Sequence, residues 1–256
     1  SLDILIKKMN LANKTNINPT VKKSDIKQAV KEAVKLGDLI KELEYLDGDE
    51  VSVEILVIDN TVNILAVTDK LTMGQPFFVE IGHSQPSQLP ISDVQKIKEL
   101  ATNAIKAIGI NNSPAHVEIM LTPQGPKMIE LGARMGGGFI TTHLVPLSTG
   151  IDMVKAVIDL CLGITPDITP RLNKGSAIRH VVGLPEGRIY SIEGVQEIST
   201  ITGVQEVGML KNIGDLVVPY KNGSDRVGYV IAQANTASDA IKISESALQG
   251  LCITIK

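Results

Sequence analysis

The chain of 256 residues has no tryptophan, only three phenylalanines and four tyrosines, and only two cysteines. So few aromatic rings leave little with which to stack nucleic-acid bases, and a net charge of −3 does not suit a phosphate backbone. Cys161 and Cys252 have no metal-binding or redox spacing, which favours the reducing cytoplasm. Apolar runs of the roughly 20 residues that cross a bilayer are also absent. We therefore expect no nucleic-acid partner and no membrane segment.

With 43% hydrophobic and 21% charged residues, the composition is that of a folded globular protein. Apolar–polar alternation predicts strands, and apolar residues at helical spacing predict helices. A capping box of Ser92 and Gln95 is expected to begin the helix over residues 92–108. The strands are expected over residues 51–57, 62–67, 75–81, 115–121 and 127–131, and the helices over 92–108, 151–162 and 236–249.

Two glutamates, Glu118 and Glu130, lie on consecutive predicted strands. If residue 122 pairs with residue 126 around a loop at 123–125, Glu118 lies directly opposite Glu130, with Cβ atoms about 5 Å apart. Carboxylates this close repel each other unless a cation lies between them, and such oxygen ligands suit Mg²⁺ together with substrate phosphates. The alternative is that both glutamates are simply exposed on a hairpin, where glutamate is common.

Arginine is scarce, with five residues against twenty lysines, and Arg134 follows Glu130 by four positions. Its guanidinium is suited to holding a carboxylate or phosphate with two hydrogen bonds. The glycines at 136–138 would let backbone N–H groups approach an anion. Two other residues are expected to have structural roles. We expect His116, on the predicted strand that carries Glu118, to pack or form a hydrogen bond, and Cys161 to be a thiol in the core.

Three segments carry a resemblance. They are residues 44–54, which read EYLDGDEVSVE, residues 116–119, which read HVEI, and residues 129–137, which read IELGARMGG. Their order and spacing resemble the nucleotide hinge and the metal-binding hairpin of the ATP-grasp superfamily. Residues 66–70 and 79–84 are similar to its carboxylate–amine ligase branch, the one related to L-amino acid ligases and biotin carboxylase.

The resemblance implies an α+β fold. An ATP-grasp domain over residues 1–170, with an antiparallel sheet backed by helices, is followed by a smaller α+β domain over 171–256. It also implies a reaction in which ATP, with Mg²⁺, activates a small carboxylate as an acyl phosphate that an amine attacks.

The resemblance further implies roles for particular residues. Glu118 and Glu130 correspond to the Mg²⁺ ligands, and Arg134 to the arginine that stabilises the acyl phosphate or holds substrate. His83 corresponds to a histidine that faces substrate or phosphate. The remaining positions form the nucleotide site, with adenine at Glu44, Tyr45 and Leu46 and the ribose hydroxyls at Glu50.

The chain departs from the family pattern in three places, and one is Leu43, which stands where relatives often have an acid that touches adenine. The family's N-terminal domain and its lid, with a lysine and a glycine-rich loop, are not recognisable, so a segment is expected to be missing near residues 19–24. Gly132 stands where many members have an asparagine that assists a second metal. Two other functions therefore stay open: a non-catalytic nucleotide-binding remnant, and a bicarbonate-using enzyme similar to biotin carboxylase or carbamoyl-phosphate synthase. The oligomeric state is open as well, with a homodimer as one option.

Overall fold

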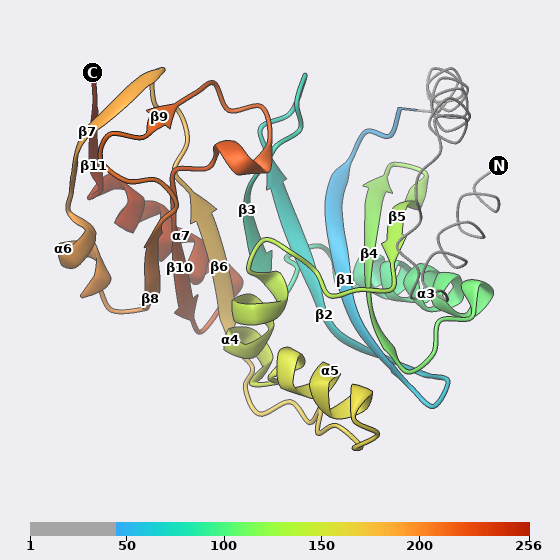
Figure 1. Ribbon diagram of the computed structural model, residues 1–256. Helices are drawn as coiled ribbons and strands as arrows, with labels where there is room; N and C mark the ends of the chain where they lie inside the picture. The colour runs from blue at the N-terminus through green and yellow to red at the C-terminus, as the bar shows by residue number, and fades with distance from the viewer. Residues whose placement is uncertain (1–44) are drawn as a thin grey trace, which may run out of the picture. The chain divides into compact units, whose positions relative to one another are not determined.

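The computed structural model describes residues 45–256, of which Leu46–Lys256 form one compact unit (Figure 1). The predictions for Glu44 and for the segment near residue 19 lie outside the described residues. The strands are β1 (Asp49–Ile58), β2 (Thr61–Thr72), β3 (Glu80–Gln85), β4 (Ser113–Thr122), β5 (Gly125–Gly132), β6 (Gly175–His180), β7 (Gly187–Glu193), β8 (Val204–Met209), β9 (Leu216–Val217), β10 (Gly228–Ala234) and β11 (Cys252–Ile255). The helices are α3 (Ile91–Ile108), α4 (Val145–Thr149), α5 (Met153–Cys161), α6 (Val195–Ser199) and α7 (Ala237–Gln249), with a short π-helix η1 (Ile140–Leu144) and a 3-10 turn η2 (Gly223–Asp225).

Most strands belong to one eight-stranded sheet in the order β5-β4-β1-β2-β3-β6-β10-β8. Every neighbouring pair in it is antiparallel. A smaller sheet has the order β11-β7-β9. The predicted α+β fold with a large antiparallel sheet is confirmed. Strands β6, β10 and β8 continue the large sheet past residue 170, and the domain boundary placed there stays a prediction.

The two faces of the large sheet differ in what covers them (Figure 1). Alternating residues of β1 and β4 pack against α3 in one hydrophobic core, with Val53, Val117 and Ile97 fully buried. Further along, Arg179 of β6 pairs with Glu245 of α7 on that same side. We call this the helix face. The other side, on which Lys70 of β2 stands opposite His83 of β3, is covered in part by the glycine-rich loop, η1 and α4, and we call it the loop face.

Local sequence explains the first hairpin. Asp59 and Asn60 join β1 to β2, and both have positive φ angles, 46° and 62°. Two such residues match the right-handed twist of paired strands, and aspartate and asparagine tolerate this conformation. The strands predicted over 51–57 and 62–67 are therefore confirmed, as is the helix over 92–108.

Three local predictions are wrong. The third strand begins at Glu80, not at residue 75, because Gly74 and Phe78 adopt positive φ angles and Phe78 N donates to Gly74 O in a tight loop. Helix α3 follows Pro90 and has no side-chain cap, so the capping box does not form. Cys161 is exposed and is not a core thiol, since it ends α5 on the outer side. Within residues 45–256, no helix is both long and apolar enough to span a bilayer.

Candidate active site

The alternation in β1 places its polar residues on the loop face. Val51 and Val53 pack towards α3, so Glu50, Ser52 and Glu54 project to the opposite side. The neighbouring strands are in register with them, because Ser52 pairs with Glu118 of β4 and Glu54 pairs with His116. Ser52, Glu54 and His116 are all buried there. Buried polar groups must find partners, and these find one another.

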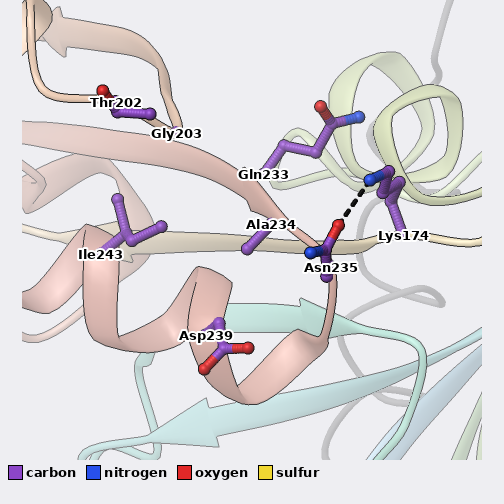
Figure 2. A pocket seen from close by; sticks show the side chains of 8 residues that line it. All are labelled: Lys174, Thr202, Gly203, Gln233, Ala234, Asn235, Asp239 and Ile243. Carbon is purple, nitrogen blue, oxygen red and sulfur yellow. Dashed lines mark hydrogen bonds between the residues drawn. The ribbon is translucent and has the colours of Figure 1, made fainter.

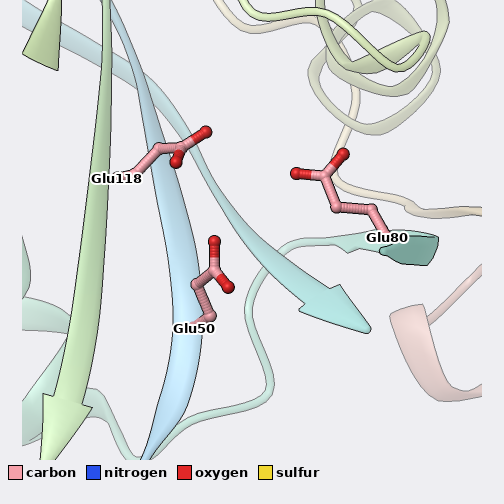
Figure 3. Close-up of side chains that lie close together, drawn as sticks. All are labelled: Glu50, Glu80 and Glu118. Atoms are coloured by element: carbon pink, nitrogen blue, oxygen red, sulfur yellow. The ribbon is translucent and has the colours of Figure 1, made fainter. Parts of the chain in front are cut away.

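Lys70 lies at the centre of three carboxylates. Its Nζ is 2.5 Å from Glu50 Oε1, 2.8 Å from Glu80 Oε1 and 3.0 Å from Glu118 Oε1. Figure 3 shows the three glutamates pointing towards one another, and their carboxylate oxygens lie within 4.8 Å of one another. Burial by itself would lower the pKa of Lys70, but the charges and hydrogen bonds of Glu80 and Glu50 outweigh it and raise the pKa. The ammonium therefore neutralises part of an acidic cluster that would otherwise suit a metal ion.

A second cation, Arg226, reaches the same cluster from the loop that precedes β10. Arg226 donates to the backbone oxygen of Glu80 at 2.9 Å and lies 3.5 Å from its Oε2. Arg226 also donates to the hydroxyl of Tyr220 at 3.2 Å. Burial would raise the pKa of Glu80, but the contacts with His83 and Lys70 outweigh it and hold that pKa well below its usual range. Glu80 is thus ionised and linked to both halves of the sheet.

His116 connects Glu118 to a fully buried carboxylate. Its Nδ1 is 2.9 Å from Glu54 Oε2 and its Nε2 is 3.2 Å from Glu118 Oε1. Burial would lower the pKa of His116, but the hydrogen bonds to Glu118 and Glu54 and their charges raise it to about 9. The same hydrogen bond from His116, together with the charge of Lys70, outweighs burial and lowers the pKa of Glu118 to about 2. The imidazolium therefore stands between two carboxylates at neutral pH.

Glu118 and Glu130 lie directly opposite each other, as the sequence predicts. The turn differs from the prediction, because Thr122 pairs with Gly125 instead of residue 126. A register shift between Glu118 and Ile119 adds one residue to β5 and restores the predicted pair. The side chain of Glu118 is 19% exposed and that of Glu130 is 62% exposed. Both carboxylates project to the loop face, one anchored in the cluster and the other at its open edge.

Arg134 lies beside Glu130 at the edge of β5. Its Nη2 is 3.5 Å from Glu130 Oε1 and its Nη1 donates to the backbone oxygen of Met135 at 3.1 Å. About half of the side chain is exposed. A guanidinium in this position can turn towards an anion held near Glu130. The predicted role of Arg134 in holding substrate or acyl phosphate stays a prediction.

His83 is buried on the loop face and has no hydrogen-bond partner within residues 45–256. Its Nε2 lies 3.5 Å from Glu80 Oε2, too far for a well-formed hydrogen bond. A Cβ at Gly138 would come within 2.8 Å of the same nitrogen, so only glycine allows this approach. His83 thus joins the cluster at the edge that faces the glycine-rich loop, and its predicted contact with substrate or phosphate stays a prediction.

The hinge residues are placed at the start of the described chain. Tyr45 is exposed and Leu46 is half-buried. Glu50 turns into the cluster, where Lys70 holds it. The predicted contacts with adenine and ribose stay predictions.

A cavity of about 370 Å³ lies at the end of β10, and Figure 2 shows the side chains that line it. Residues at the end of β10 and the start of α7 line it, and Lys174 Nζ contacts Asn235 Oδ1 at 2.5 Å across one side. None of the predicted site residues lines this cavity. The chemistry-bearing groups lie on the loop face, away from the residues that line this cavity.

Comparison with known families matches these features. A model of the ATP-grasp domain matches residues 12–143, and a model of the L-amino acid ligase C-terminal domain 2 matches residues 180–256. The chain belongs to the ATP-grasp family. The prediction of this family, made from the hinge and the glutamate hairpin, is confirmed.

Relatives of this ATP-grasp chain include named ligases and synthases. Carnosine synthase 1 of Gallus gallus is 25% identical over 68% of the chain, and alanine–anticapsin ligase of Bacillus subtilis (strain 168) is 30% identical over 59%. These matches span 19% and 34% of the two relatives, so the chain covers about a third or less of their length. The crystal structure of L-amino acid ligase from Bacillus licheniformis superposes with a TM-score of 0.75 at 24% identity, over 90% of this chain and 61% of that one.

Four members of the cluster were not predicted as site residues from the sequence: Glu54, Lys70, Glu80 and Arg226. The signal for Glu54 is present in the sequence, since a glutamate at an alternating position between valines and isoleucines of a central strand needs a buried partner. Lys70 and Glu80 lie inside the motifs at 66–70 and 79–84. Their partnership depends on the pairing of β2 with β3, which the sequence does not reveal.

Proposed function

We propose that the protein carrying this chain is an ATP- and Mg²⁺-dependent ligase that activates a small carboxylate as an acyl phosphate for attack by an amine. The observation that carries this proposal is the facing pair of Glu118 and Glu130 on neighbouring strands. Two carboxylates on one face, beside an arginine, form the all-oxygen ligand set that suits Mg²⁺ with nucleotide phosphates. The donor set therefore fits the ion that the family uses.

The reaction balances as two substitutions. An oxygen of the substrate carboxylate attacks the γ-phosphorus of ATP, the bond to the bridging oxygen breaks, and ADP leaves. The amine nitrogen then attacks the acyl carbon, the bond to phosphate breaks, and the nitrogen releases its proton to solvent. A bound Mg²⁺ supplies charge neutralisation of the phosphates.

Phosphoryl transfer also requires that the reacting groups be held in position and that their charge be neutralised, and residues of this chain supply both. Glu118 and Glu130 would hold the ion from neighbouring strands. Arg134 offers two parallel donors to the phosphoryl or carboxylate group at the exposed edge. Lys70 contacts Glu118 Oε1 at 3.0 Å and helps to keep this carboxylate in place.

Replacing each metal ligand tests the proposal. Release of ADP is measured with Mg²⁺-ATP and pairs of L-amino acids, in the protein that carries the chain. We expect Glu118→Gln and Glu130→Gln each to slow ADP release by about 100-fold or more, since each removes charge stabilisation from phosphoryl transfer. Glu99→Gln, on the outer side of α3, is the matched control and should leave the rate unchanged.

Wild-type rates in both variants would refute the assignment of the two ligands. ADP release that requires bicarbonate and no amine would refute the carboxylate–amine reaction while leaving the nucleotide site intact. Calorimetric binding of Mg²⁺-ATP without release, for every pair of amino acids, would refute catalysis itself.

A further inference from the structure

We propose that Glu54 and His116 are positioning residues for Glu118: together they hold one oxygen of its carboxylate, so that the other oxygen is presented to a metal ion. The inference rests on the proposed function, because it takes Glu118 as a metal ligand. Neither Glu54 nor His116 has a role in the reaction as proposed above.

The contacts form a chain of fixed links across two strands. Ser52 Oγ donates to Glu54 Oε1 at 2.8 Å, and Glu54 Oε2 lies 2.9 Å from His116 Nδ1. His116 Nε2 then reaches Glu118 Oε1 at 3.2 Å. Because Ser52 pairs with Glu118 and Glu54 pairs with His116, the sheet itself sets these positions. Both ring nitrogens of His116 are used, so the ring cannot turn without losing a partner.

The two carboxylate oxygens of Glu118 differ in their contacts, and the oxygen without contacts is the one available to a metal ion. His116 and Lys70 both contact Oε1, the latter at 3.0 Å. Within residues 45–256, Oε2 of Glu118 has no hydrogen bond or ion pair. A carboxylate fixed through one oxygen loses less conformational freedom when the other oxygen binds an ion. Histidine ligands of metals are oriented by carboxylates in a comparable way, and here a histidine orients a carboxylate.

The glycine-rich loop encloses the pair. A Cβ at Gly136 would lie 2.6 Å from Glu54 Oε2 and 2.8 Å from His116 Nδ1, so no larger residue fits. Thr141 Oγ1 donates to Gly136 O at 2.9 Å and holds the loop in place. Sealing a carboxylate and an imidazole away from water is costly, and an apolar pair would usually be at least as stable. Stability alone therefore does not account for these two residues.

Metal binding separates a positioning role from a structural one. Binding of Mn²⁺ is measured by electron paramagnetic resonance in the whole chain, with a non-hydrolysable ATP analogue present. Glu54→Gln keeps the size of the side chain and removes its charge, and His116→Gln removes the ring. We expect each to weaken Mn²⁺ binding by about 10- to 100-fold, as changes behind a metal ligand commonly do.

Two further variants complete the design. Glu245→Gln removes a carboxylate that pairs with buried Arg179 at 2.9 Å on the helix face, and it should bind Mn²⁺ like the wild type. Ser52→Ala removes one hydrogen bond to Glu54 and leaves its charge, and it should weaken binding only a few-fold. If Glu54→Gln does not fold, as judged by circular dichroism, Ser52→Ala replaces it in the test. Unchanged Mn²⁺ binding by Ser52→Ala would then overturn the positioning role.

The outcomes distinguish this inference from the proposed function. If the wild type binds Mn²⁺ and folded Glu54→Gln and His116→Gln bind it equally well, the positioning role is wrong and the ligase proposal stands. If the wild type binds no Mn²⁺ with the nucleotide analogue, both are wrong. Equal weakening in Glu245→Gln would show a general loss of stability and would also overturn the positioning role.

Discussion

His116 and His180 are buried on the loop face of the same sheet, in its two halves. They are 4% and 2% exposed, so their burial is nearly equal. His116 lies between two carboxylates, which outweigh burial and raise its pKa to about 9. For His180, burial and the nearby charges of Arg226 and His83 lower the pKa to about 3. The comparison teaches that the neighbours, and not the depth, decide whether a buried histidine is charged.

The two halves of the large sheet also differ in the residues that their loop faces carry. Around His116, the loop face carries Glu50, Glu54, Glu118 and Lys70. Around His180, it carries Tyr229 and the apolar residues that pack against η1 and α4. The charged half faces the proposed site, and the apolar half anchors the helices that cover it. Substitutions in the two halves should therefore differ in size and in their dependence on pH.

The largest effect is expected from Lys70→Met. The change leaves Glu50, Glu80 and Glu118 without their shared cation, so the free energy of unfolding should fall by about 3–5 kcal/mol at pH 7. The loss should shrink at lower pH, because protonated carboxylates no longer repel. Unfolding in urea at pH 7 and pH 5 measures both. Lys242→Met, whose side chain is 73% exposed on α7, should change the free energy by less than about 0.5 kcal/mol.

An intermediate effect is expected from Ile231→Ala in the apolar half. Ile231 is fully buried in the core beneath η1 and α4, so the cavity should cost about 2–4 kcal/mol. No titrating group is removed, and the loss should be the same at pH 5 and pH 7. Urea unfolding at the two pH values checks this, with exposed Ile213→Ala as the control. If the loss of unfolding free energy in Ile231→Ala changed with pH as it does in Lys70→Met, the proposed difference between the two halves of the sheet would be wrong.

The smallest effects on the free energy of unfolding, on the order of 1–3 kcal/mol, are expected from substitution of the two histidines. These effects should depend on pH in opposite directions. The pKa of His116 is raised above its unfolded value of 6.5, so its stabilisation is complete below pH 6.5 and lost as the pH rises through about 9. The pKa of His180 is depressed to about 3, so the unfolded chain binds the proton more tightly and stability is lost as the pH falls below 6.5.

Two substitutions measure this contrast in metal-free protein. His116→Gln should be destabilised relative to the wild type at pH 6, with the difference narrowing towards pH 9.5. His180→Gln should gain stability relative to the wild type as the pH falls from 7 to 4.5. Parallel pH profiles for the two variants would contradict the assignment of one charged and one neutral imidazole.

Much of the fold follows from local patterns, and the misses have local causes. Alternation predicts β1, β2, β4 and β5, and helical spacing predicts α3 and α7. The strand expected over 75–81 fails because positive φ angles at Gly74 and Phe78 close a loop there. The hairpin of β4 and β5 is instructive, since its turn and its register each differ from the prediction by one residue, and the bulge beside Glu118 cancels the difference.

The sequence by itself determined the family, the alternating strands and the pair formed by Glu118 and Glu130. The family is carried by short motifs in a fixed order, and the strands and the pair by residues close together along the chain. Only the tertiary structure decided that Lys70 lies among Glu50, Glu80 and Glu118, and that Glu54 reaches Glu118 through His116. These partners come from four strands, and their distances depend on the order and register of the sheet. Side-chain charge is local information, but the field that acts on a buried charge is set by whatever the fold places beside it.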